Sequence, residues 1–266
     1  MRALLCRELG DIAKLEVGDI PGPAMAADEV RIGVKASGVN FPDILMVEGK
    51  YQVKPALPFV PGLEAAGEVL EVGRDVGDHV KVGDRVLAFA RHGGSHAEEV
   101  VVQGGIATPI PDAMDYVSAA AFPVAYGTAH FALAYRGNLK AGETLLVLGA
   151  AGGVGLAVLD VARALDMQTI AVAASPHKLE LCITRGAHEV IDYTSADLKT
   201  RVREITGGGA DVVLDPVGGE HTEAGLRALR DFGRLIIIGF ASGDIATLPT
   251  NQILLRNRTV VGVDWG

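Results

Sequence analysis

Four glycines fall within the seven residues Gly149-Ala150-Ala151-Gly152-Gly153-Val154-Gly155. An apolar run, Thr144 to Leu148, precedes them, and a helical pattern, Val154 to Leu165, follows. Glycine lets a backbone turn sharply and approach a pyrophosphate, whose charge is favoured at a helix amino terminus. The segment therefore predicts a dinucleotide-binding loop, contacting the ligand through Gly152, Gly153 and Val154, although Ala150 replaces the first glycine of the usual GxGxxG pattern. The alternative is a tight structural turn without a ligand.

The segment after the next predicted strand bears on which dinucleotide is bound. It reads Ala173-Ala174-Ser175-Pro176-His177-Lys178 and holds no acidic residue to accept from a ribose 2′-hydroxyl. Ser175 can donate to a 2′-phosphate and Lys178 can neutralise it, so NADPH is predicted as the cofactor. Tyr193 is expected to border the same phosphate or the adenine. The alternatives are a solvated Lys178 and a Tyr193 that only packs.

Strands dominate the first part of the chain, residues 1–122. Alternating polar and apolar residues, separated by Gly, Pro and Asp clusters, predict a compact, barrel-like β unit. The predicted strands are Glu29–Ala36, Glu68–Val72, Asp84–Phe89 and Glu98–Val102.

Strands and helices alternate in residues 123–266, as in a doubly wound parallel sheet. Six strands are predicted: Thr144–Leu148, Thr169–Ala173, Glu189–Asp192, Asp211–Leu214, Leu235–Ile238 and Thr259–Val263. The helices between them are predicted at Val154–Leu165, from Leu179 to Thr184 onward, at Leu198–Ile205 and at Thr222–Leu229. The expected fold class is therefore α/β, a Rossmann sheet beside a β-barrel unit.

Composition narrows the classes of partner. With 24 Lys and Arg against 33 Asp and Glu, the net charge is -9, which disfavours a nucleic-acid surface. A membrane span needs about 20 apolar residues, and the longest apolar stretch, Leu145 to Val158, carries four glycines. Cys6 and Cys182 form no CxxC motif. We expect a soluble, cytoplasmic protein with reduced cysteines and no membrane partner.

Five motifs resemble the medium-chain dehydrogenase/reductase superfamily, in particular its zinc-independent quinone oxidoreductase (zeta-crystallin-like) branch. They are Ser37–Asp43, Pro61–Gly67, Gly83–Val86, Gly149–Gly155 and Asp215–Gly219, in the family's order. The resemblance implies a GroES-like catalytic domain in residues 1–122 and a Rossmann NADPH-binding domain in residues 123–266. It also implies hydride transfer from NADPH to a small electrophilic substrate such as a quinone.

The resemblance also allows zinc to be tested by residue type. Zinc alcohol dehydrogenases of the superfamily carry Cys at the position of Asn40, His at that of Leu63, and a second Cys near Pro123-Val124. Because none of these positions offers a thiolate or an imidazole, and the two cysteines cannot form a four-Cys lobe, no metal site is expected. Without a Lewis acid, the substrate must already be electron-poor.

The same resemblance assigns roles to other residues. Asn40 is expected to hold the substrate carbonyl or the nicotinamide ribose, and Tyr51 to donate to a developing oxyanion. The alternatives are structural: Asn40 would be a turn residue, and Tyr51 would be a packing group of a lid. The remaining cofactor contacts implied by the family are Thr128, Val217, Gly218, Phe240, Ala241 and Ser242.

Two other functions remain as alternatives. An NADPH-dependent enoyl or enone reductase would use the same cofactor, and a non-catalytic, crystallin-like nucleotide-binding protein would keep the fold without turnover. The strand Thr259–Val263 resembles the family's dimer edge, so a homodimer is expected. Family members continue beyond the sixth strand, whereas this sequence ends at Trp265-Gly266. We therefore expect the family's return segment to be absent.

Overall fold

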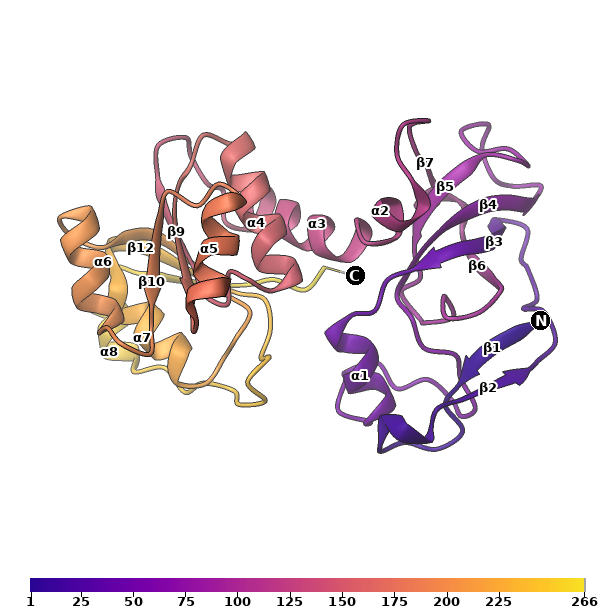
Figure 1. Ribbon diagram of the computed structural model, residues 1–266, viewed down its shortest axis with the longest axis horizontal. Helices are drawn as coiled ribbons and strands as arrows, with labels where there is room; N and C mark the ends of the chain where they lie inside the picture. The colour runs from indigo at the N-terminus through magenta and orange to yellow at the C-terminus, as the bar shows by residue number, and fades with distance from the viewer. Residues whose placement is uncertain (266) are drawn as a thin grey trace. The chain divides into compact units, whose positions relative to one another are not determined.

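The computed structural model describes residues 1–265 and divides into two compact units, Met1–Val124 and Ala125–Gly266. The first unit runs from indigo to magenta in Figure 1, and the second from rose to yellow. Each unit has its own sheet and its own hydrophobic core. They are described separately.

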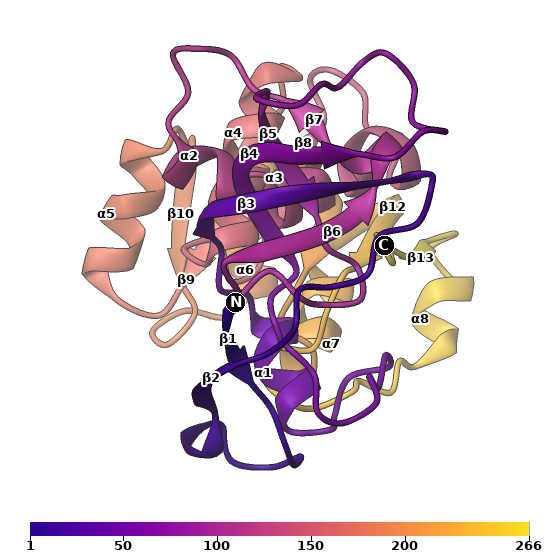
Figure 2. The ribbon, with the colours of Figure 1, turned by 90° about the vertical axis from the view of Figure 1, so that its right-hand side faces the viewer.

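The first unit is built on an antiparallel sheet in the order β6-β3-β4-β5-β7, labelled in Figure 2. Its strands are β3 (Glu29–Ser37), β4 (Glu64–Val72), β5 (Arg85–Phe89), β6 (Glu99–Gln103) and β7 (Thr108–Pro109). A separate hairpin pairs β1 (Arg2–Leu5) with β2 (Glu16–Asp19). The four strands predicted here are confirmed to within a residue or two, except that β4 begins at Glu64 rather than Glu68. The added residues Ala65, Ala66 and Gly67 are buried without alternation, so the period-2 pattern did not mark them.

Short helices connect these strands. They are η1 (Ile12–Lys14), α1 (Phe41–Val47), η2 (Gly104–Ile106) and α2 (Tyr116–Ala120). Asp115 caps α2 by accepting from the Ser118 backbone N–H at 2.8 Å. At α1, the carboxylate of Asp43 accepts from the backbone N–H of the N-cap residue Asn40 at 2.7 Å. This bond fixes the chain where Asn40 enters the helix.

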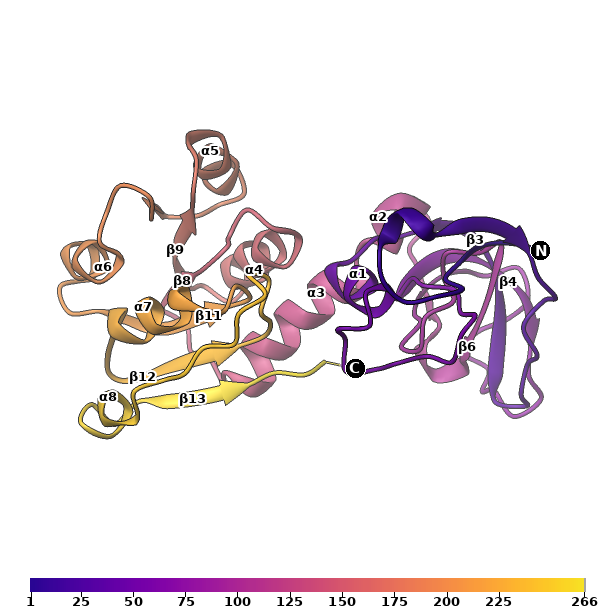
Figure 3. The same cartoon turned by 90° about the horizontal axis from the view of Figure 1, so that it is seen from below.

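The second unit holds a six-stranded parallel sheet in the order β10-β9-β8-β11-β12-β13, with β13 at one edge (Figure 3). The strands are β8 (Thr144–Val147), β9 (Gln168–Ala173), β10 (Glu189–Asp192), β11 (Ala210–Asp215), β12 (Leu229–Ile237) and β13 (Thr259–Gly262). The order reverses between β8 and β11, and ligands of open α/β sheets bind at the carboxyl ends of such strands. The predicted doubly wound sheet is confirmed.

Helices cover both faces of this sheet. The helical segments α3 (Pro123–His130), η3 (Phe131–Arg136), α4 (Gly153–Ala164) and α5 (Pro176–Thr184) contribute to one core cluster. The opposite cluster contains residues of α6 (Leu198–Thr206) and α7 (Glu220–Ala228), and α8 (Thr250–Leu254) precedes β13. Strand β8 divides its side chains between the two clusters, because Leu145 and Val147 join the first and Leu146 the second. No helix in residues 1–265 is both long and apolar enough to cross a membrane.

Strand β12 departs most from its prediction, since it begins at Leu229 instead of Leu235. Its pairing with β11 shifts register between Ala210 and Val212. Phe232 has a positive φ of 62° there, and such an interruption hides a strand from an alternation test. Helix α7 accordingly ends at Ala228.

Candidate functional site

The glycine-rich segment forms the turn between β8 and α4. Gly149 has a φ of 57°, a left-handed conformation that favours glycine, whereas Ala150 is fully buried and has no positive φ. The backbone N–H of Ala150 donates to the carbonyl of Val172 at 3.1 Å, which ties the turn to β9. Alanine is tolerated at position 150 because the left-handed residue is Gly149.

The glycine turn leads into the amino terminus of α4, where backbone N–H groups have no helical partner. Helix α4 begins at Gly153, and its first helical bond runs from the Leu156 N–H to the Gly152 carbonyl at 2.9 Å. The N–H groups of Gly153 and Val154 precede that bond and therefore offer donors to an anion. A Cβ at Gly153 would meet no atom within 4 Å, whereas one at Gly155 would lie 2.6 Å from the carbonyl oxygens of Gly149 and Ala150. Gly155 thus allows the helix to pack against the turn, and Gly152 and Gly153 leave the space in front of it free.

The turns after β11 and β12 are bonded to each other. The N–H of Ala241 donates to the Pro216 carbonyl at 3.0 Å, and that of Ser242 to the Val217 carbonyl at 2.8 Å. Gly218 has a φ of 83°, and a Cβ there would lie 3.1 Å from the Cα of Phe240. The structure therefore brings together the five residues expected in these two turns: Val217, Gly218, Phe240, Ala241 and Ser242. The Cβ of a residue at 149 would lie 2.9 Å from Val217 Cγ2, so the glycine turn adjoins the same group.

A buried carboxylate to which the sequence assigned no role, Asp215, fixes the turn after β11. Asp215 is fully buried, and its Oδ1 accepts from the backbone N–H groups of Val217 at 2.7 Å and Gly218 at 3.0 Å. Its Oδ2 accepts from the Thr222 hydroxyl at 2.5 Å, which anchors the turn to α7. The available signal was the position of Asp215, an acidic residue at the end of an otherwise apolar strand.

The carboxyl end of β9 presents Ser175, Lys178 and Tyr193. Ser175 is the N-cap of α5 but makes no capping bond with its side chain, and Lys178 is exposed on the first turn. The backbone N–H of Tyr193 donates to the Ala173 carbonyl at 3.4 Å, so Tyr193 lies beside the end of β9. Its ring packs edge-on against His221 at a centroid distance of 4.9 Å. The packing expected as an alternative for Tyr193 is thus present.

Thr128 lies half-buried on α3. Tyr126 of the same helix donates to Asp160 Oδ2 on α4 at 3.0 Å, and Gly127 faces the ring of Trp265. The Tyr126 bond attaches α3 to the helix that follows the glycine turn. No described bond joins Thr128 itself to that turn.

Asn40 belongs to a buried polar cluster in the first unit. Its Nδ2 donates to Glu64 Oε1 at 2.7 Å, and Glu64 Oε2 accepts from the backbone N–H of Val124 at 2.8 Å. Glu64 is only 2% exposed. One carboxylate therefore bridges Asn40 and Val124 and directs the Asn40 amide nitrogen inward, because an ionised carboxylate can only accept.

Close packing holds this bridge. A Cβ at Gly38 would lie 2.1 Å from Glu64 Oε1, so a side chain there would displace the carboxylate. Ser37 donates to the backbone carbonyl of Glu64 at 2.9 Å and bonds Ser95 through their hydroxyls, also at 2.9 Å. Ser37 and Gly38 thus hold the Glu64 carboxylate in place. The sequence alone did not indicate this role of Glu64.

A second buried carboxylate, Asp43, lies in the same cluster. Its Oδ1 and the Nδ1 of His96 are buried without a hydrogen-bond partner, while His96 Nε2 donates to the Gly38 carbonyl at 3.1 Å. Burial raises the pKa of Asp43 above its ordinary 3.8, against the opposing effects of the Asn40 N–H and His96. Burial likewise raises the pKa of Glu64 above 4.5, although the Val124 N–H and Asn40 oppose it; the charge of Asp43 adds to the rise.

Tyr51 lies at the other end of α1 from Asn40. The helix has seven residues, so its two ends are roughly 10 Å apart. Tyr51 packs against an apolar cluster that includes Leu63 and Val124. Tyr51 thus packs in the apolar cluster and Asn40 bonds within the polar one, and Val124 contributes to both.

Asn40, Leu63 and the Pro123-Val124 pair stand at the positions where zinc relatives carry ligands. Glu64 links Asn40 to Val124, and Leu63, the residue before Glu64, packs in the same apolar cluster as Val124. The side chains at these positions are an amide and two aliphatic groups, which do not fit a zinc ion. Among residues 1–265, no group of three or more His, Cys, Asp or Glu side chains is placed to hold a metal.

Comparisons with known proteins agree with this architecture. Residues 26–112 match the alcohol dehydrogenase GroES-like domain, and residues 153–266 match the zinc-binding dehydrogenase family. Quinone oxidoreductase-like protein 2 of Bos taurus is 43% identical over 267 aligned residues, covering 100% of this chain and 75% of that protein. These matches confirm that the first unit contains a GroES-like domain.

Solved structures give the same result. The quinone oxidoreductase of Escherichia coli complexed with NADPH is 30% identical with a TM-score of 0.93, covering 100% of this chain and 81% of that one. The enoyl reductase CurK is 27% identical with a TM-score of 0.89, over 99% of this chain and 81% of that one. The chain belongs to the medium-chain dehydrogenase/reductase superfamily, in its quinone oxidoreductase branch. It is thus an oxidoreductase by family.

Proposed function

We propose that this protein binds NADPH at the glycine turn and transfers its hydride, without zinc, to a quinone. The observation that carries the proposal is the open amino end of α4, where the N–H groups of Gly153 and Val154 precede the first helical bond. A bound NADPH supplies the hydride, and hydride plus one proton reduces a quinone to its hydroquinone by two electrons. The Escherichia coli relative complexed with NADPH supports this choice of cofactor.

The adenosine end of the cofactor is proposed to lie at the carboxyl end of β9. Ser175 and Lys178 would hold the 2′-phosphate there, since that segment carries no carboxylate to repel it. Tyr193 would border it. The bonded turns containing Val217, Gly218 and Phe240 to Ser242 would hold the ribose and nicotinamide, with Thr128 contacting the nicotinamide end.

Asn40 is proposed to orient the substrate carbonyl or the nicotinamide ribose. Glu64 uses one N–H of the Asn40 amide, which leaves the second N–H and Oδ1 for a ligand. Tyr51 is proposed to donate to the developing oxyanion. Zinc independence rests on the residue types at positions 40, 63 and 124, which offer no thiolate or imidazole.

A direct assay tests this function. The metal-stripped chain is mixed anaerobically with NADPH and either a para-benzoquinone series or an enone and enoyl-thioester series. We expect NADPH oxidation with the quinones, with kcat/KM lowered in Asn40→Ala and unchanged in the matched control Asn138→Ala, an asparagine outside the proposed site. Turnover of neither series, or turnover restored only by stoichiometric zinc, would reject the proposal.

Enoyl or enone reduction is the second candidate, favoured by the likeness to the enoyl reductase CurK. Hydride addition to an activated C=C bond needs the same cofactor and a donor at the developing enolate. Preference for the enoyl-thioester series in the assay above would select this function.

We also propose that two chains associate through β13. This strand lies at the edge of the parallel sheet, and Val260 on it is 36% exposed. An edge strand offers unpaired backbone groups to a second copy. Sedimentation of the wild-type chain and of Val260→Pro, which removes an outward-facing backbone donor from β13, tests the association; a monomeric wild type would reject it.

A further inference from the structure

A pocket of about 290 Å³ in the second unit is lined by five cationic side chains. They are Lys199, Arg203, Arg227, Arg256 and Arg258, and the other lining residues are Gln252 and Leu255. No acidic side chain of the described chain lines this basic pocket. Five cations converge here although the whole protein carries a net charge of -9, so the cluster does not reflect the general composition.

Carboxylates neutralise only part of this charge. Arg227 pairs with Glu223 at 2.5 Å, and Arg256 pairs with Asp231 at 2.7 Å. Within residues 1–265, no carboxylate forms an ion pair with the other three cations, Lys199, Arg203 and Arg258. The basic pocket therefore keeps an excess of positive charge.

One of its arginines, Arg258, is buried, and so is the Nε atom of a second, Arg203. Arg258 is 6% exposed; its Nη2 donates to the Leu229 carbonyl and its Nε to the Arg230 carbonyl at 3.3 Å. Burial, then the neighbouring charges of Arg256 and Arg203, lower the pKa of Arg258 below its ordinary value, which Asp231 opposes. The Nε of Arg203 is buried without a hydrogen-bond partner. Clustered cations and an unmet buried donor are both unfavourable until an anion is present.

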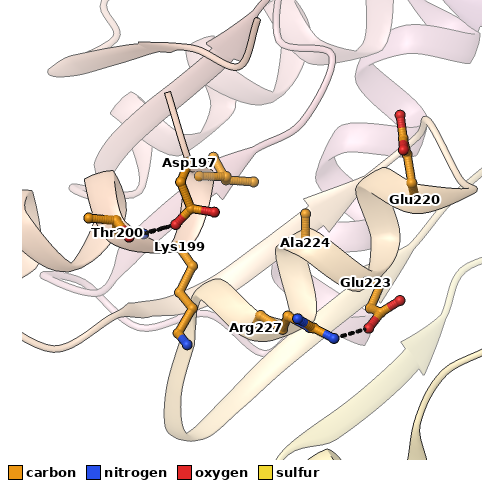
Figure 4. Close-up of a pocket in the computed structure, with 8 residues that line it drawn as sticks. Asp197, Lys199, Thr200, Glu220, Glu223, Ala224 and Arg227 are labelled. Carbon is orange, nitrogen blue, oxygen red and sulfur yellow. Dashed lines mark hydrogen bonds and ion pairs between the residues drawn. The ribbon is translucent and has the colours of Figure 1, made fainter. Parts of the chain in front are cut away.

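An adjoining pocket shows where an anion would not bind. This larger pocket, about 420 Å³, shares Lys199 and Arg227 with the basic pocket but is also lined by Asp197, Glu220 and Glu223. Figure 4 shows Arg227 paired with Glu223 there and Lys199 extending from the start of α6. Its carboxylates would repel an anion, which leaves the basic pocket as the favoured position.

We propose that the basic pocket binds a compact phosphate-bearing anion, of the size and charge of a diphosphate, separately from the nucleotide of the proposed function. Guanidinium groups present fixed forks of donors that match phosphate oxygens, and Lys199 adds a point charge. A diphosphate carries enough charge to offset the three unpaired cations, whereas a monocarboxylate does not. Because the ligand would bind the folded chain, it would also stabilise it.

Calorimetric titration of the full chain with inorganic pyrophosphate, in the presence and absence of saturating NADPH, tests this site. We expect one pyrophosphate per chain in both conditions, and a higher Tm than in sodium acetate or chloride of equal ionic strength. Arg203→Gln and Arg256→Gln should each weaken binding at least about tenfold, the factor for one lost charge-assisted bond. Arg201→Gln, on the same helix but paired with Glu204, is the matched control and should bind as the wild type does.

Four results would overturn the site. Displacement of pyrophosphate by NADPH would assign the binding to the nucleotide turn. Equal weakening in Arg201→Gln and Arg203→Gln, or equal stabilisation by acetate, would show a general ionic effect. Undetectable binding to wild-type protein that is folded by circular dichroism would reject it as well, whether or not NADPH binds.

Discussion

Asn40 and Glu64, 24 residues apart, are joined by a 2.7 Å hydrogen bond from the amide nitrogen to the carboxylate, whose other oxygen accepts from the Val124 N–H. This bridge orients the amide that we propose contacts the ligand. Glu64 is a positioning residue, because it acts through Asn40. Replacing Glu64 therefore tests the orientation of the Asn40 amide while the amide itself is still present.

Glu64→Gln should lower kcat for quinone reduction about tenfold, and an accompanying loss of NADPH affinity would assign the Asn40 amide to the nicotinamide ribose rather than to the substrate carbonyl. Glutamine offers one acceptor oxygen to two donors, so either Asn40 or Val124 loses its partner, at about 1–3 kcal/mol for a buried group. Steady-state kinetics and a separate NADPH titration measure the two effects. Glu68→Gln, four residues along β4, is the control. Equal kcat values for Glu64→Gln and Glu68→Gln would contradict the positioning role.

The free energy of unfolding should depend on pH differently in the wild type and in Glu64→Gln. The pKa of Glu64 is raised in the folded protein, so the folded state holds its proton to higher pH than the unfolded state, whose value is near 4.5. The stabilisation is therefore complete below pH 4.5 and is lost as the pH rises through the folded pKa. Denaturant unfolding should show the free energy of wild type falling relative to Glu64→Gln over that window. A difference that is constant with pH, or that grows with pH, would contradict the raised pKa.

Two glycines in the first turn of α4, Gly153 and Gly155, should respond differently to alanine. At Gly155 the added Cβ would lie 2.6 Å from two carbonyl oxygens, so we expect a loss of about 1–3 kcal/mol of stability. At Gly153 it would meet no protein atom, so stability should hold while NADPH binding weakens about tenfold through collision with the phosphates. Chemical denaturation and NADPH titration distinguish the two. Gly208→Ala, also in open space, is the control; unchanged NADPH affinity in Gly153→Ala would refute binding at this turn.

Lys178 should determine the preference for the phosphorylated cofactor. Lys178→Gln should weaken NADPH binding about tenfold and leave NADH binding unchanged, because only NADPH carries the 2′-phosphate. Titration of both nucleotides gives the ratio, with the exposed Lys81→Gln as control. If both nucleotides lost affinity equally, Lys178 would not contact the 2′-phosphate.

Asp215 should be one of the most sensitive positions for stability. Asp215→Ala removes the acceptor of two backbone N–H groups and the Thr222 hydroxyl in a fully buried site, so we expect a loss of about 3–5 kcal/mol. Asp197→Ala, which removes an exposed N-cap, should cost only about 1 kcal/mol. Urea unfolding compares them, and similar losses for the two variants would refute the structural role of Asp215.

The sequence predicted those features that depend on local pattern. The strand, glycine turn and helix from Thr144 to Ala164 follow from adjacent residues, and the parallel sheet follows from the alternation of such units. It did not predict the partners of Asn40, because Glu64 and Val124 lie 24 and 84 positions further along the chain. Nor did it predict the early start of β12, because a residue with a positive φ interrupts the alternation there.

Single-turnover hydride transfer tests the central claim most directly. Metal-analysed, zinc-free chain with one equivalent of bound NADPH is mixed anaerobically with para-benzoquinone, using NADPH carrying either hydrogen or deuterium at the transferred position. We predict that one hydroquinone forms per NADPH and that the reaction is slower with deuterium. When the quinone is omitted, NADPH should stay reduced. NADPH that stays reduced with every acceptor, or a reaction that requires one zinc per chain, would contradict the account.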